Sequence, residues 1–331
     1  MKFFFLFGSF VLMVTSFSAQ NDSLRFQLHG LIDGYSVFGK TNASGKIPYL
    51  VSSSNLNSFQ INLNVMEFTL ENSKWKYALS PAFGTYMQQN YAAEKAYKRW
   101  IYEMYVQRKF NRSSIAAGVF SSPYTQETPK SGDQLSYSRS LAPEYVPYYI
   151  SGLKYQRTLS SYLNLSLFAM NGWQKMNYDQ FSLSFGSLLE YKRGNWKVNW
   201  STYIGREKPV FAKEVQTRIL SEWNVQYSQG KWTIQSCAFV GTQGINFSRN
   251  WWQVNTQLAY SATDRTRFYG RVEYFSDPNT VQLSTGKLAS ESIGVNYALS
   301  DVLNIGTEFR GFHSEKKAFE PYQFLFFQLK F

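Results

Sequence analysis

The amino-acid sequence predicts an all-β fold: a transmembrane antiparallel up-and-down β-barrel of about 16 strands. Three observations lead to this prediction. Apolar and polar residues alternate with period two along most of the 331 residues. Short and long connections alternate between the apolar–polar segments, and the tryptophans gather at segment ends. Counts of 14 or 18 strands remain open as alternatives.

The N-terminal segment has the three parts of a secretory signal peptide. Lys2 precedes a short apolar stretch from Phe3 to Val14, and small residues follow it before Gln20. This stretch is too short to span a bilayer as a helix. We therefore expect residues 1–19 to be a signal peptide, with cleavage after Ser18 or Ala19, and residues 20–331 to form the barrel.

Composition and charge exclude several other classes of protein. Aromatic residues make up 18% of the chain, which argues against disorder, and a single cysteine with two histidines argues against a disulfide scaffold or a structural zinc site. Removing the signal leaves 33 basic and 22 acidic residues, an excess of +11. In an exported protein this charge is expected to meet anionic lipid, polysaccharide or solutes and no nucleic acid, and it predicts a preference for anions.

The predicted strands have one apolar and one polar face. Trp196, Val198 and Trp200, for example, alternate with Lys197 and Asn199. Most segments are close to the length of about 9–11 residues that a tilted membrane strand needs. In chain order they are Leu24–Gly39, Phe59–Glu71, Lys74–Met87, Trp100–Phe110, Ser113–Phe120, Tyr148–Arg157, Ser161–Asn171, Gln180–Lys192, Asn195–Arg206, Thr217–Ser228, Lys231–Thr242, Trp251–Ala262, Arg265–Phe275, Lys287–Leu299, Val302–Phe312 and Pro321–Phe331.

The connections between these segments differ in length in a regular way. Seven short turns alternate with eight longer connections, of which the third runs from Ser121 to Pro147 and the last from His313 to Glu320. Outer-membrane barrels have tight periplasmic turns and longer outer loops. An even number of strands then leaves both termini in the periplasm.

The tryptophans provide a second indication of a membrane barrel. Rings at both water boundaries are typical of the aromatic girdles of such proteins. The predicted girdle comprises Trp75, Trp196 and Trp232 after short turns, and Trp100, Trp251 and Trp252 after long loops.

The second predicted strand does not keep its phase. Phe59 to Val65 place their apolar residues on one face, whereas Met66, Phe68 and Leu70 continue on the other. This change predicts a β-bulge near Val65 and Met66. The alternative is a lumen that is locally aromatic.

The inward face of the strands is expected to line the channel. If Trp196, Phe268 and Phe331 point to lipid, charges of both signs face the lumen and set up a transverse field that favours hydrated solutes. Salt bridges that only brace the wall are the alternative role for each residue. The pore-lining candidates are Arg25, His29, Asp33, Glu103, Lys109, Lys197, Glu222, Arg267, Arg271, Glu273, Glu308 and Arg310.

The third long connection is the best candidate for a constriction. Pro123, Pro129, Pro143 and Pro147 stiffen it, which suits a segment folded into the lumen. An outer loop packed on its neighbours is the alternative. Its charged candidates are Glu127, Lys130, Asp133, Arg139 and Glu144.

Catalytic, cofactor and metal sites are not expected. Only His29 and His313 are available, on distant strand ends, although His313 could pair with Glu308 or Glu315 at the outer rim. No Gly-rich phosphate loop or metal-ligand spacing is present, and Cys237 is interpreted as a wall residue. The sequence therefore predicts no enzyme, no cofactor and no metal.

Four short motifs stand out between residues 100 and 174: Ala117-Gly118-Val119-Phe120, Tyr137-Ser138-Arg139-Ser140, Pro147 to Gly152, and Asn171-Gly172-Trp173-Gln174. With these motifs, the stretch resembles the beta-barrel porin-2 (OmpL-like) family of outer-membrane proteins, common in Bacteroidota. The element Thr125-Gln126-Glu127 departs from the Gly-x-Glu of that family. The resemblance implies a porin-like channel and does not identify its cargo.

Two functional hypotheses follow. The first is an outer-membrane porin for passive diffusion of small hydrophilic solutes or ions; the second is a closed or loop-plugged barrel with an adhesion or structural role, with a barrel hydrolase a weaker third. In each case we expect a Gram-negative outer membrane, contact with its lipid and lipopolysaccharide, and recognition by the barrel assembly machinery through the C-terminal Phe331.

Overall fold

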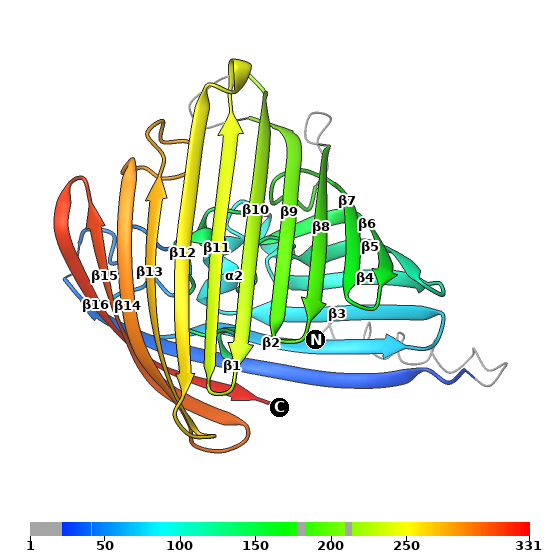
Figure 1. The fold of residues 1–331 in the computed structure, drawn as a ribbon, viewed down its shortest axis with the longest axis horizontal. Coiled ribbons are helices and arrows are strands. Elements are labelled where there is room, and N and C mark those ends of the chain that lie inside the picture. The colour runs from blue at the N-terminus through cyan, green and yellow to red at the C-terminus, as the bar shows by residue number, and fades with distance from the viewer. Residues whose placement is uncertain (1–21, 41, 178–182, 209–213) are drawn as a thin grey trace.

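A computed structural model describes residues 22–331 except 41, 178–182 and 209–213. Within this part of the chain, the strands form one closed antiparallel barrel in which every strand pairs with its neighbours in sequence and β1 pairs with β16 (Figure 1). The predicted fold class and the count of 16 strands are confirmed. The expected signal peptide, residues 1–19, lies outside the described residues.

The strands are joined by connections that carry a few short helices. The helices are α2 (Thr85–Asn90), α3 (Leu141–Glu144) and the 3-10 turns η1 (Ala96–Lys98), η2 (Ser131–Asp133) and η3 (Ile245–Phe247). The strands are β1 Arg25–Gly39, β2 Phe59–Glu71, β3 Trp75–Phe83, β4 Ile101–Lys109, β5 Ser113–Ser121, β6 Tyr149–Ser160, β7 Leu163–Met170, β8 Ser184–Arg193, β9 Trp196–Glu207, β10 Gln216–Gln229, β11 Trp232–Gln243, β12 Arg249–Ser261, β13 Thr266–Ser276, β14 Lys287–Ala298, β15 Leu303–Ser314 and β16 Lys317–Lys330.

The barrel closes where the first strand meets the last. Leu31 of β1 pairs with Lys330 of β16, and the ladder continues to Gly39 and Tyr322. In Figure 1 the blue β1 and the red β16 lie side by side at the lower left. Closure leaves no free sheet edge, so the strands satisfy their backbone groups around the ring, as a bilayer requires.

The period-two pattern decides which side chains face outward. Trp196, Phe268 and Leu325 are each nearly half exposed on the outer surface, whereas their strand neighbours Asn199, Tyr269 and Phe324 are buried inside. Alternate residues of a strand point to opposite faces. Among the described residues, no helix combines the length and apolar character needed to cross a membrane.

Several strand boundaries differ from the prediction. β3 ends at Phe83, because Gly84 turns the chain with φ +122° into α2, so the predicted strand through Met87 is wrong. β16 begins at Lys317, and the predicted long connection from His313 to Glu320 is a two-residue turn at 315–316. Lys317 pairs with Ser314 and Glu320 with Phe312, so the β15–β16 ladder extends through charged residues that the sequence had assigned to a loop. The predicted start of β8 at Gln180 lies outside the described residues.

The predicted bulge in β2 exists but lies three residues earlier. Asp33 of β1 pairs with Leu63, and the next residue, Gly34, pairs with Ile61, so Asn62 is the extra residue. Asn62 and Leu63 are both buried inside the barrel. A bulge at this position moves Phe59 and Met66 to the same outer face.

Five of the six predicted girdle tryptophans lie on the outer surface, between 37% and 51% exposed: Trp75, Trp100, Trp196, Trp232 and Trp252. The prediction for Trp251 is wrong. Its side chain is fully buried on the inner face of β12, opposite Gly241, whose lack of a side chain leaves space for the indole. Adjacent residues of a strand face opposite sides, so Trp251 and Trp252 could not both be outside.

A pair of glycines allows β4 to β7 to approach closely. Gly118 of β5 pairs directly with Gly152 of β6, with φ of +145° and +148°. A Cβ at Gly118 would lie 2.1 Å from the Met104 carbonyl oxygen. We expect Gly118→Ala to destabilise the barrel by roughly 1–3 kcal/mol or more, because L residues disfavour this backbone conformation.

The measurement is the folded fraction seen as heat-dependent mobility on a detergent gel. Gly270→Ala is the control, since Gly270 of β13 has no positive φ and its added Cβ would lie 3.5 Å from the Ser292 carbonyl oxygen, an ordinary contact distance. Equal folded fractions for the two variants would contradict the role of the Gly118–Gly152 pair.

Candidate channel lining and constriction loop

The connection between β5 and β6, residues 122–148 and here called loop 3, lies inside the barrel. The Tyr137 ring stacks on Phe326 of β16 with centroids 4.1 Å apart, and its hydroxyl donates to Asp33 of β1 at 3.1 Å. On the other side, the Thr125 N–H donates to Glu222 of β10. These strand residues all face the interior, so loop 3 crosses the lumen as predicted, and the alternative of an outer loop is wrong.

A buried ionic network holds the middle of loop 3. Arg310 of β15 lies 2.5 Å from Glu273 of β13, and Arg271 lies 3.3 Å from Glu273 and 3.6 Å from Glu308. The side chains of all four are completely buried. The alternation in the sequence predicted that all four face inward, and the structure brings them together.

Loop 3 supplies the polar groups that complete this network. The Ser138 N–H donates to Glu308 at 3.0 Å, and the Leu141 N–H donates to Glu273 at 2.6 Å. The Arg310 guanidinium donates to the Ser138 hydroxyl at 3.0 Å and to the Arg139 carbonyl at 2.8 Å. Buried charges are tolerated only when their partners are complete. The buried charges of the wall therefore need the polar groups of loop 3, and the same bonds hold loop 3 in place.

The carboxylate of Glu127 ties loop 3 to itself. It accepts the Ser140 N–H at 3.1 Å and the Ser140 hydroxyl at 2.5 Å, and Gln257 of β12 donates to it as well. Burial raises the pKa of Glu127 above its ordinary value, although the charge of Arg271 and the donation from Ser140 oppose that rise. This network fixes the turn that leads into α3.

An ion pair within loop 3 also holds the first long loop, residues 40–58. Arg139 lies 3.1 Å from Glu144, whose other oxygen accepts the N–H groups of Val51 and Ser52 at 2.7 and 3.0 Å. Burial by itself would lower the pKa of Arg139, but the Glu144 carboxylate outweighs it and holds that pKa above its ordinary value. Arg139 is therefore charged at all physiological pH values.

The remaining charged residues of loop 3 contact the wall nearer the short-turn end. Lys130 lies 3.0 Å from Glu67 of β2. Asp133 lies 2.6 Å from Lys330 of β16, which also donates to the Gly132 carbonyl at 2.9 Å. All five charged candidates of loop 3 thus have defined partners inside the barrel.

The other pore-lining candidates are spread along the inner wall. Glu103 accepts the Ser121 N–H at 2.9 Å, Lys109 lies 2.9 Å from Glu71, and Arg267 donates to the Gln134 carbonyl at 2.9 Å. Arg25 and His29 share the inner face of β1 with Asp33, and Lys197 lies opposite Lys192 near the short-turn end. Their faces agree with the prediction; their roles in permeation stay predictions.

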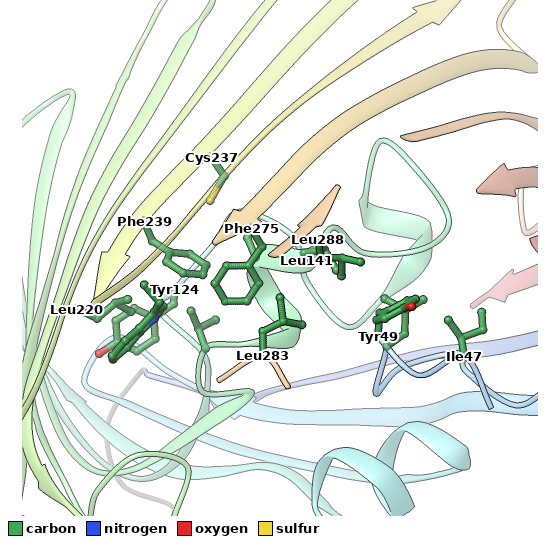
Figure 2. Packing of buried hydrophobic residues seen from close by; sticks show 14 of the residues in the cluster. Ile47, Tyr49, Tyr124, Leu141, Leu220, Cys237, Phe239, Phe275, Leu283 and Leu288 are labelled. Carbon is green, nitrogen blue, oxygen red and sulfur yellow. The ribbon is translucent and has the colours of Figure 1, made fainter. Parts of the chain in front are cut away.

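Apolar side chains fill part of the lumen, which the sequence pattern did not predict. Tyr124 and Leu141 of loop 3 pack against inward residues of the wall such as Leu220, Phe239 and Phe275. Figure 2 shows Phe239 and Phe275 pointing toward each other, with ring centroids 5.6 Å apart in an edge-to-face arrangement. Apolar residues on both faces of a strand, as in Phe324 to Phe327, were the signal that could have revealed it.

A second apolar cluster covers the long-loop end beside β2 to β6. Tyr86 and Tyr91 from the α2 segment pack with Tyr148 and Tyr149, and the rings of Tyr91 and Tyr149 stack 4.3 Å apart. The Tyr149 hydroxyl donates to Glu94 at 2.7 Å. Together the two clusters fill much of the lumen at this end.

A cavity of about 220 Å³ remains between loop 3 and the wall formed by β2 and β4. This volume corresponds to roughly seven water molecules at about 30 Å³ each. Its lining combines tyrosines, serines and charged groups, including Glu67, Glu103, Tyr102, Lys130 and Arg139. We call it the loop-3 cavity.

The remaining candidates for chemistry do not form a site. His313 lies on the outer face and contacts Glu291 at 3.0 Å, so the predicted pairing with Glu308 or Glu315 is wrong. Glu308 faces the lumen, and Glu315 lies 3.7 Å from Lys287. Cys237 is buried in the wall, as predicted. In the described ranges, no group of three or more His, Cys, Asp or Glu could hold a metal ion.

The sequence and the fold were compared with known proteins. The profile of the beta-barrel porin-2, OmpL-like family matches residues 25–323. No curated protein sequence matches the chain.

Solved structures with a similar fold are outer-membrane proteins and porins. A loop-deletion mutant of OmpT, an outer membrane protein of Vibrio cholerae, has a TM-score of 0.65 at 12% identity, covering 94% of this chain and all of that one. An anion-selective porin from Comamonas acidovorans has a TM-score of 0.64 at 10% identity, covering 93% and 100%. Salmonella typhi OmpF, in complex with daunomycin, has a TM-score of 0.67 at 10% identity, covering 92% and 97%. At these identities the likeness shows the fold alone.

The network around loop 3 yields a stability prediction. Arg310→Met leaves Glu273 and the Ser138 hydroxyl with fewer partners in a buried setting, and removing one member of a buried ion pair costs about 3–5 kcal/mol. We expect trypsin to cleave loop 3 after Lys130 or Arg139 much faster in the folded variant than in the wild-type barrel.

The control is Lys287→Met, which removes an ion pair whose side chains are more than half exposed. Exposed pairs contribute about 0–1 kcal/mol, so its cleavage rate should match that of the wild type. A similarly slow rate for Arg310→Met would show that the network does not hold the loop.

Proposed function

The chain belongs to the beta-barrel porin-2, OmpL-like family, and from this membership we propose that it is a porin for the passive diffusion of small hydrophilic solutes or ions across an outer membrane. The observation that carries the proposal is the loop-3 cavity, a polar space inside a closed barrel whose outer surface is apolar. A closed sheet with these two faces separates lipid from a hydrated interior. We propose no catalytic activity.

The location and orientation follow from the same arrangement. β1 begins and β16 ends at the edge of the barrel that carries the short turns, which supports periplasmic termini. Residues 1–19 are proposed to direct export to a Gram-negative outer membrane, in keeping with their signal-like composition. A Bacteroidota source is proposed on the motif resemblance alone.

The proposed partners are the surroundings of such a barrel. The outward apolar residues are suited to outer-membrane lipid and lipopolysaccharide. Phe331 is 52% exposed, and its N–H donates to the Gly30 carbonyl at 3.1 Å, which fixes the C-terminus on the outer surface. This placement supports recognition by the barrel assembly machinery through Phe331.

One observation favours a second function. The two apolar clusters fill much of the lumen at the long-loop end, as a plugged barrel with an adhesion or structural role would require. The loops then act through their outer surfaces, and no solute passes.

Ion conductance of the purified protein in planar bilayers separates the two functions. For a porin we expect stable unitary currents of uniform size, because loop 3 is held in one position. Heat-dependent mobility on a detergent gel first establishes that the barrel is folded. A folded barrel that carries no current would contradict the porin and support the plugged barrel.

A further inference from the structure

The free space beside loop 3 lies on one side of the lumen. On the other side, inward residues from β10 to β16, such as Leu220, Glu308, Arg310 and Gln328, are completely covered, with exposed fractions of 0%. The loop-3 cavity, in contrast, is bounded by Glu67 of β2 and by Tyr102 and Glu103 at β4. The loop-3 cavity, beside β2 and β4, is therefore where we expect a solute to pass.

Carboxylates outnumber cations along this cavity. Its lining contains Glu67, Glu103, Glu127 and Asp133, against Lys130 and Arg139. Lys130 is paired with Glu67 and Arg139 with Glu144, so neither cation is free to attract an anion. The balance of the lining is negative.

The net charge of the lining stays negative when the charged residues behind it are counted as well. Asp133 is paired with Lys330. Glu127 lies next to the buried network in which Arg271 and Arg310 face Glu273 and Glu308, so two arginines serve three carboxylates. This network leaves a second uncompensated negative charge beside the passage.

Glu103 is the carboxylate best placed to act on a passing ion. Its Oε1 accepts the N–H and the hydroxyl of Ser121. Among the described residues, its Oε2 has no hydrogen-bond partner and no Lys or Arg nitrogen lies within 4.0 Å of the carboxylate. Glu103 is also only partly buried, so its charge faces the cavity.

Two lysines on the same wall oppose this effect and lie outside the cavity lining. The Lys154 amino group lies 5.0 Å from the Phe120 ring and 5.8 Å from the Tyr105 ring, and that of Lys76 lies 6.0 Å from Tyr105. Both are farther than ion-pair distance from Glu103. They weaken the negative potential of the passage, and neither forms an ion pair with Glu103.

We propose that the passage beside loop 3 prefers small cations, with Glu103 as the residue that determines the preference. The proposal rests on the porin function and reverses the anion preference that the net charge of +11 predicts. Charges on the outer loops and turns are screened within about 8 Å at physiological salt, whereas those lining a narrow passage are not. The cavity of about 220 Å³ has room for a small cation with part of its hydration shell.

The test is the reversal potential of the full-length barrel in planar bilayers across a KCl gradient. We expect K⁺ to permeate about three- to tenfold better than Cl⁻ in the wild type, since one unit charge a few ångströms from the ion path has about this effect in a hydrated channel. Glu103→Gln should lower the ratio clearly toward 1, with the remaining preference due to the network beside Glu127. Lys154→Gln should raise the ratio above that of the wild type. This second variant tests the proposal even if Glu103→Gln does not fold.

Asp301→Asn is the matched control, because it removes one negative charge from an exposed turn outside the lumen and should leave the ratio unchanged. A wild-type preference for Cl⁻, or equal ratios for Glu103→Gln and the wild type, would overturn the proposal and leave the porin function intact. A folded barrel without current would overturn the porin function and, with it, this proposal.

Discussion

The structure depends on the ionic contact between the wall and loop 3. Arg310 and Glu273 lie 2.5 Å apart, fully buried, on strands β15 and β13. Without loop 3 this pair would face water in a wide lumen. With the N–H groups of Ser138 and Leu141 and the Ser138 hydroxyl in place, the pair becomes part of a dry, fully bonded network. The same contact fixes the loop across the lumen and thereby leaves the loop-3 cavity on the opposite side.

The rest of the interior is consistent with this arrangement. Tyr137 of loop 3 stacks on Phe326 of the wall, and the wall residues Phe239 and Phe275 contact each other. Apolar residues of loop 3 therefore pack against a wall that is itself locally apolar. Packing of this kind stabilises a segment because it removes apolar surface from water. Ion pairs determine where loop 3 lies, and the apolar contacts add to the free energy that keeps it there.

The barrel could be predicted from the sequence, whereas the packing of loop 3 inside it could not. Period-two alternation predicts strand faces well because it is local, and the inward placement of Arg271, Glu273, Glu308 and Arg310 followed directly from it. Their partners in loop 3 could not be predicted, since they are more than 130 residues away in the chain. The prediction for Trp251 was wrong for a different reason: alternation allows only one of Trp251 and Trp252 to lie outside, and the space beside Gly241 on the neighbouring strand accommodates Trp251 inside. Several of the pieces that suggested the family, including Tyr137 to Ser140 and Gly118, are the ones that hold or position loop 3.

The most direct test of this account is amide hydrogen exchange of the folded barrel, read out by mass spectrometry on peptides that cover residues 136–146. The N–H groups of Ser138, Ser140 and Leu141 donate to buried carboxylates, so they should exchange as slowly as those of the neighbouring strands although they lie in a loop. Exchange as fast as that of the exposed turn at 315–316 would contradict the claim that the buried ionic network holds loop 3 in the lumen.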